Sequence, residues 1–271
     1  MSMVQYAAGF VAPRHMLFIP GEAYMSRERR QYVRFAFYRV DPLWRRISPG
    51  DRASAKAEFA DIVDGWSGRI LLRTYSTIGT RPDCDFLLWQ VSENLDDFGE
   101  IAADISSSQL GRYIETPHAF LSMTKHSMYV SEHTHEGQEG TRLTIAPGGA
   151  KYLFVYPFVK TRTWYLLSQA ERQRIMTVHI AMGHKYPTVK INTTYSFGLD
   201  DQEFVVAFES DYPADFLDLV QELRETESSA YTLRDTPMFT CISMPVREIL
   251  EALCRDARVS APTGTRETIR V

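Results

Sequence analysis

The sequence has little cysteine and no long apolar run, and each absence excludes a class of protein. Its three cysteines, an odd and widely spaced set without a CxxC pair, exclude a disulfide framework and argue against a thiolate zinc site. No apolar run approaches the roughly 18 residues that a membrane-spanning helix needs. The N-terminus lacks the basic-then-apolar layout of a signal peptide, because its "SRERR" cluster follows a weak apolar stretch. We therefore expect a soluble protein of the reducing cytoplasm.

An excess of charge of one sign is also missing. The 30 basic and 34 acidic side chains give a net charge of -4, so no global basic surface points to nucleic acid or to a membrane. The 271 residues and the 44% hydrophobic content suffice for one large domain or two smaller ones, each with its own core.

The alternation of apolar residues predicts the same order of elements twice. Aromatic and β-branched runs such as "QYVRFAFYRV", "CDFLLWQVSE", "KYLFVYPFVK" and "EFVVAFES" read as strands. Amphipathic runs such as "RASAKAEFADIVDGW" and "PADFLDLVQELRET" read as helices. Both halves run β-α-β-β-α-β, so we predict an α+β fold of two tandem ferredoxin-like (βαββαβ) lobes with antiparallel sheets.

The same reading divides the chain into five parts. We expect an N-terminal arm at 1–30, an N-terminal lobe at 31–135, a polar Gly-rich linker loop at 136–150, a C-terminal ligand-binding lobe at 151–254 and a polar tail at 255–271.

One predicted helix in the second half, "SQAERQRIMTVHIAMG", carries a candidate metal ligand. Ser168 and Glu171 form the Ser-x-x-Glu pattern of a capping box, and Gly183 is a natural terminator. His179 lies with Ile175, Val178 and Met182 on the stripe expected to be buried, whereas His184 is expected to face elsewhere. A single imidazole suits a heme iron, because the porphyrin supplies four nitrogens. From spacing alone, a hydrogen-bonded core histidine is the more common case, and the metal ligand is the alternative.

A resemblance adds to this reading. The segments "YPFVKTRTWYLLSQAERQRIMTVHIAMGHKYP", "VKINTTYSFGLDDQEFVVAFESD" and "LRETESSAYTLRDTPMF", supported by "DGWSGRILLRTY" and "LGRY", resemble the chlorite dismutase superfamily. Within it, the sequence is most similar to the coproheme decarboxylases (heme synthases), particularly the actinobacterial kind. The resemblance covers about residues 31–250 and implies tandem ferredoxin-like lobes, heme in the C-terminal lobe and a homopentamer.

The resemblance assigns site residues position by position. It implies His179 as the iron ligand, Tyr156 of "YPFVK" as the redox-active residue and Trp164 as an aromatic beside the heme. Lys160, Arg224 and Ser229 are implied to contact propionates. A carboxylate is expected to orient the second nitrogen of His179, with Glu227 as a candidate.

Departures from the family pattern separate its subfamilies. The distal arginine of chlorite dismutases is replaced by Ile191, which cannot hydrogen-bond chlorite. The actinobacterial decarboxylases use a distal histidine from the loop between the lobes. "MYVSEHTH" offers His133 as the general base, with His135 as the competitor, and a third reading has neither reaching the iron.

The expected function is peroxide-dependent decarboxylation of iron coproporphyrin III (coproheme) to heme b. Coproheme is then both substrate and cofactor, and hydrogen peroxide the second substrate. Two alternatives stay open: a heme or coproheme carrier or sensor without catalysis, and a chlorite dismutase-like heme enzyme, which Ile191 disfavours.

Overall fold

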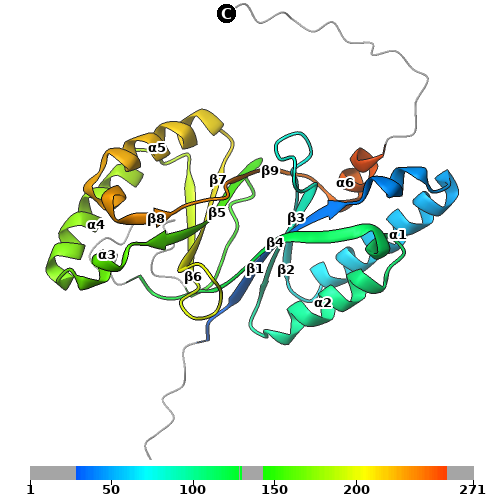
Figure 1. Ribbon diagram of the computed structural model, residues 1–271, viewed down its shortest axis with the longest axis horizontal. Helices are drawn as coiled ribbons and strands as arrows, with labels where there is room; N and C mark the ends of the chain where they lie inside the picture. The colour runs from blue at the N-terminus through cyan, green and yellow to red at the C-terminus, as the bar shows by residue number, and fades with distance from the viewer. Residues whose placement is uncertain (1–28, 128, 130–142, 255–271) are drawn as a thin grey trace, which may run out of the picture.

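The computed structural model describes residues 29–127, 129 and 143–254 (Figure 1). The first half runs from β1 to β4 in the predicted order, with short 3-10 turns at Pro42–Arg46 and Leu110–Tyr113. Its elements are β1 (Tyr32–Val40), α1 (Pro49–Ser67), β2 (Leu71–Ser76), β3 (Phe86–Ser92), α2 (Asp96–Ser107) and β4 (Ile114–Met123). The βαββαβ order predicted for this half is confirmed.

The second half repeats that order and adds short elements. Its main elements are β5 (Tyr152–Lys160), α4 (Gln169–Gly183), β6 (Lys190–Tyr195), β7 (Phe204–Ser210), α5 (Pro213–Glu225) and β9 (Phe239–Ser243). The additions are α3 (Arg162–Leu166), the 3-10 turn η4 (Glu227–Tyr231), β8 (Thr232–Arg234) and the helix α6 (Val246–Leu253). The fold is therefore the expected α+β class with two ferredoxin-like lobes.

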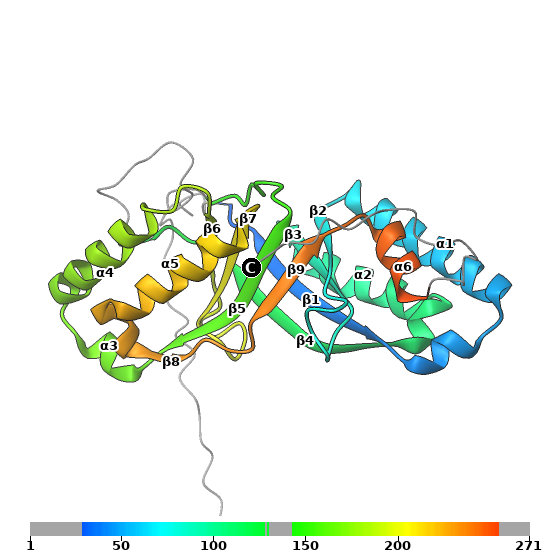
Figure 2. The same cartoon turned by 90° about the horizontal axis from the view of Figure 1, so that it is seen from above.

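The strands of the two halves form one continuous antiparallel sheet. Its order is β7-β6-β4-β1-β3-β2-β9-β5-β8, and β7 also pairs with β5, so the sheet closes on itself. The halves meet along β2–β9 on one side and along β4–β6 on the other. In Figures 1 and 2, α1, α2 and α6 lie outside this sheet on one flank, and α3, α4 and α5 lie on the opposite flank.

Side chains that alternate along the strands fill the interior of the closed sheet. The pair Phe37 and Phe239 illustrates how the halves are joined, because their rings stack with centroids 3.9 Å apart. Phe35 and Trp89 stack in the same interior at 5.4 Å. All four rings are essentially inaccessible to solvent. The apolar interior therefore fixes the position of the second half against the first.

The helix α6 belongs to the second half by sequence but packs on the first. Val246, Ile249, Leu250 and Leu253 are buried in the core that α1 and α2 cover. Thr74 of β2 donates its hydroxyl to the carbonyl of Met244, 2.6 Å away, just before α6 begins. No element was predicted here, although the spacing of these four apolar residues is that of a helix face.

No helix in the described part of the chain is long and apolar enough to cross a membrane.

Candidate functional site

A large cavity lies in the second half between the sheet and the helices α4 and α5. Its volume is about 1110 Å³, and β5, β6, β7, α3, α4, α5 and η4 all contribute to its wall. Seven predicted site residues line it: Tyr156, Lys160, Trp164, His179, Ile191, Arg224 and Ser229. Positions that are up to 73 residues apart in the sequence are thus brought to one place.

The helix α4 carries His179 and begins as the sequence predicts. The Ser168 hydroxyl accepts from the Glu171 amide at 3.3 Å, and the Glu171 carboxylate accepts from the Ser168 amide at 3.1 Å. This reciprocal capping box satisfies two amides that would otherwise lack partners in the first turn. The helix ends at Gly183, so its length and its orientation are set at both ends.

The cavity face of α4 differs from the predicted stripe. Ile175 is buried, but Val178 is 51% exposed. His184, expected to point elsewhere, lines the cavity with His179. This prediction was wrong, because the backbone of His184 at the C-cap keeps helical angles and its amide still donates to the Ile180 carbonyl at 3.2 Å.

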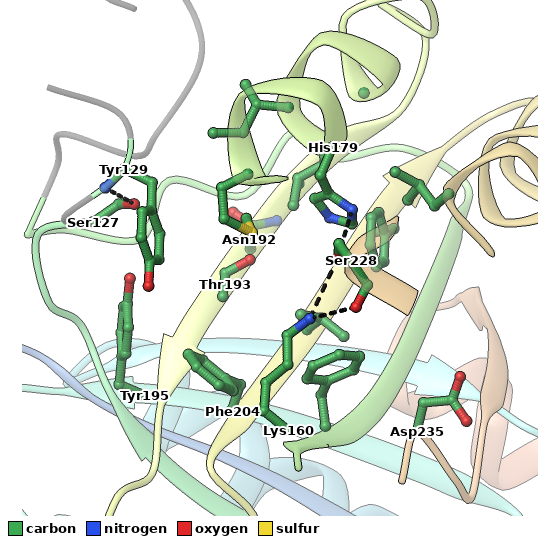
Figure 3. Close-up of a pocket in the computed structure, with 18 of the residues that line it drawn as sticks. Ser127, Tyr129, Lys160, His179, Asn192, Thr193, Tyr195, Phe204, Ser228 and Asp235 are labelled. Carbon is green, nitrogen blue, oxygen red and sulfur yellow. Dashed lines mark hydrogen bonds between the residues drawn. The ribbon is translucent and has the colours of Figure 1, made fainter. Parts of the chain in front are cut away.

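The environment of His179 keeps its imidazole neutral. Burial, reinforced by the positive charge of Lys160, lowers the pKa of His179 to about 4. A neutral imidazole at neutral pH has a free lone pair, which is the form that ligates a metal. Nδ1 of His179 lies 3.3 Å from Oγ of Ser228, so this hydroxyl orients the ring (Figure 3).

Ser228, rather than Glu227, is the partner of His179. The Glu227 carboxylate receives two bonds from Nη2 of Arg174, at 2.8 and 2.9 Å, on the outer side of α4. The expectation of a carboxylate beside His179 was therefore wrong for Glu227. Ser228 carried no signal in the sequence, because its position depends on how η4 packs against α4.

Lys160 is buried and points toward the same hydroxyl. Its Nζ donates to the Ser228 carbonyl at 2.9 Å and lies 3.3 Å from the Ser228 hydroxyl. It also lies 4.6 Å from the ring centroid of Trp164, a cation–π distance. Burial lowers the pKa of Lys160 to about 8, against a smaller opposing effect of Glu203. Figure 3 shows Lys160, Ser228 and His179 converging from three different elements.

Tyr156 lies on β5 and is only 8% exposed. Its ring stacks on Phe208 of β7 at 5.9 Å. Burial, with the nearby charge of Asp235 added, raises the pKa of Tyr156. The phenol is therefore protonated at neutral pH and can give up a hydrogen atom as a unit.

Arg224 and Ser229 lie at the end of the cavity that also contains Asp235. Nη2 of Arg224 pairs with the Asp235 carboxylate at 2.8 Å, and the Ser229 hydroxyl donates to the Arg224 carbonyl at 2.6 Å. Ile191 of β6 contributes an apolar side chain to the wall. His133 and His135 lie outside the described residues. Another histidine, His126, lines the cavity and was assigned no role from the sequence.

The lining is strongly basic, which the overall composition hides. Among the described lining residues, the basic side chains outnumber the acidic ones by five to one. The basic residues are Lys125, Lys160, Arg172, Lys190 and Arg224, and the acidic one is Asp235. The whole chain carries a net charge of -4, so the cavity concentrates positive charge in an acidic protein. Lys125, Arg172 and Lys190 were not predicted.

Comparison with known proteins agrees with this geometry. The sequence matches the Chlorite dismutase family over residues 52–244. It is similar to the coproheme decarboxylase of Mycolicibacterium smegmatis, with 27% identity over 214 residues that cover 76% of this chain and 90% of that protein.

Solved structures show the same fold. The chlorite dismutase of Candidatus Nitrospira defluvii in complex with imidazole is similar with a TM-score of 0.75 and 26% identity, covering 82% of this chain and 94% of that one. A mutant of that enzyme gives the same TM-score and coverage at 27% identity. Because the family match spans most of the chain and the fold agrees, the protein belongs to the chlorite dismutase family.

Proposed function

We propose that the protein decarboxylates coproheme to heme b at the expense of hydrogen peroxide. The observation that carries this proposal is that a neutral imidazole, a protonated phenol and an excess of positive charge line one cavity of about 1110 Å³. The similarity to a coproheme decarboxylase supports it. A homopentamer, which the family resemblance implies, and a cytoplasmic location, which the cysteine usage led us to expect, are part of the same proposal.

The residues fit an iron porphyrin. The volume of about 1110 Å³ slightly exceeds the roughly 300–1000 Å³ of ordinary ligand pockets, so a large flat ligand has room. His179 offers a single neutral nitrogen, which is what the axial position of a porphyrin iron requires. Five basic side chains in the wall match the four carboxylate arms of coproheme better than the two arms of heme b.

Each residue then has a defined task. His179 binds the iron of the substrate, and Ser228 fixes the orientation of its ring. Arg224, with Ser229, binds a carboxylate arm at the Asp235 end, where exchange of the Asp235 ion pair releases the guanidinium. Lys160 supplies positive charge on the His179 side. The apolar wall at Phe208 and Ile191 excludes water.

Bound iron porphyrin and peroxide supply the oxidising chemistry. Per arm, one propionate loses carbon dioxide, two electrons and one proton to become a vinyl group, while peroxide takes up two electrons and two protons to form two waters. Tyr156 gives up its phenolic hydrogen and then takes a hydrogen atom from the β-carbon of the propionate. Its raised pKa keeps that hydrogen in place until oxidation. His133 is the proposed base toward peroxide, and His135 is the alternative.

The test follows the mass of the porphyrin after peroxide is added to coproheme-loaded protein. We expect loss of two carboxyl groups in the wild type and no loss in Tyr156→Phe. Tyr152→Phe is the matched control, because Tyr152 lies four residues earlier on β5 and does not line the cavity. Bleaching of intact coproheme by the wild type would instead identify a carrier or sensor.

The ligand of the iron is tested separately. Ferric coproheme added to wild type and to His179→Ala should give different visible spectra, because only the wild type offers an imidazole. Identical spectra would exclude His179 as the ligand.

A further inference from the structure

Arg172 is a basic residue of the cavity wall. Neither the sequence resemblance nor the proposed reaction assigns it a role. It lies on α4 seven residues before His179, with Met176 between them. All three side chains line the cavity. Spacings of four and three residues place them on one face of the helix, and seven residues correspond to about 10 Å along its axis. Arg172 is therefore displaced from the iron position toward the rim of a bound porphyrin.

The guanidinium of Arg172 contains a buried donor, Nε, without a hydrogen-bond partner among the described residues. A buried donor without a partner costs free energy unless a ligand satisfies it. Arg174, two residues along, differs from Arg172, because its side chain is 62% exposed and its Nη2 donates to both carboxylate oxygens of Glu227.

Arg172 and Arg224 lie at different ends of the cavity. The positive charge of Arg172 acts on Tyr129, whereas Arg224 pairs with Asp235. Figure 3 shows Tyr129 and Asp235 on opposite sides of the group formed by Lys160, Ser228 and His179. A porphyrin whose iron lies at His179 would thus have one basic residue toward each of two opposite edges.

We infer that Arg172 binds a carboxylate arm on the edge of the porphyrin opposite to the one that Arg224 binds. The inference rests on the proposed porphyrin ligand and extends it. Tyr156 lies near Arg224 and Asp235, as the effect of both charges on its phenol shows. The arm at Arg172 is therefore remote from the reacting phenol, and Arg172 anchors the edge whose carboxylates survive the reaction. A planar guanidinium suits this task, because it can donate two parallel bonds to one carboxylate.

The experiment compares two ferric porphyrins that differ only in charge: coproheme and its tetramethyl ester, whose arms carry no carboxylate. Binding is followed by absorbance titration for wild type, Arg172→Met and the matched control Arg174→Met. We expect Arg172→Met to weaken coproheme binding by about tenfold or more, the value of a charge-assisted bond. Its affinity for the ester should be unchanged, and Arg174→Met should leave both affinities unchanged.

Two results would overturn the inference. One is unchanged coproheme affinity in Arg172→Met, and the other is an equal loss for coproheme and ester, which would show a packing role only. Arg172→Gln, which keeps a polar side chain of similar reach, provides the same comparison if the methionine variant does not fold. If the wild type did not bind coproheme at all, the proposed function would be wrong. That result is distinguishable from the two results that contradict only the role of Arg172.

Discussion

Because the pKa of His179 is depressed, we expect the ligand-free protein to lose stability as the pH falls below about 6.5. In the unfolded chain a histidine accepts a proton near pH 6.5, whereas in the fold the pKa of His179 is about 4. Between these values the unfolded state binds more protons, so the free energy of unfolding falls as the pH falls. The difference between these two pKa values corresponds to a loss of about 3 kcal/mol in the free energy of unfolding, which is complete near pH 4 and absent above pH 6.5.

The assay is urea unfolding of ligand-free protein at pH 7 and at pH 4.5, for wild type and for His179→Gln. Other groups titrate in both proteins, so the difference between the two proteins isolates His179. The wild type should lose about 2–3 kcal/mol more than the variant. Lys160→Met should show an intermediate loss, because Lys160 is the second cause of the shift. Equal losses in wild type and His179→Gln would refute the reasoning.

Four further substitutions concern the first half and the helix α6 that packs on it, and their effects are measured by thermal or urea unfolding. Gly111→Ala should destabilise the protein by about 2–4 kcal/mol, because the added Cβ would collide with backbone carbonyl oxygens of α2. Gly99→Ala should stabilise the protein by about 0.5–1 kcal/mol, because open space surrounds this position. Leu250→Ala should cost about 2–5 kcal/mol if α6 is part of the core of the first half, and a cost near zero would contradict that packing. Trp66→Phe should cost about 1–3 kcal/mol, because the indole N–H donates to Asp104 at 2.8 Å and joins α1 to α2; an unchanged midpoint would show that water replaces the bond.

Periodicity and capping predicted most of the fold, because each main element has a local cause. The Ser168–Glu171 box fixes where α4 begins, and alternation along β5 separates cavity residues from interior ones. The helix α6 was not predicted, although its four buried apolar residues have the spacing of a helix face. What could not be predicted is the closure of the sheet, since β2–β9 and β4–β6 pairing carries no local signal.

Some residues of the candidate site could be predicted from the sequence, and others could not. The family resemblance assigned His179, Tyr156 and Lys160, and the structure brings them into one cavity. Ser228 could not be found from sequence, because a serine in a 3-10 turn acquires its task only through packing. Arg172 could have been found, since a basic residue seven positions before a ligand candidate on the same helix face is a readable pattern. The roles of these residues stay predictions until the variants are measured.

The pairing of β9 with β2 and the seat of α6 on α1 have a consequence for how the molecule is made. During synthesis, the first half leaves the ribosome before residues 246–253 do. Until then, the part of its apolar core that α6 covers is exposed. Only when the end of the chain arrives can the beginning complete its core. Chains that end before α6 would therefore expose the apolar residues that this helix covers, and we expect them to aggregate or to be degraded.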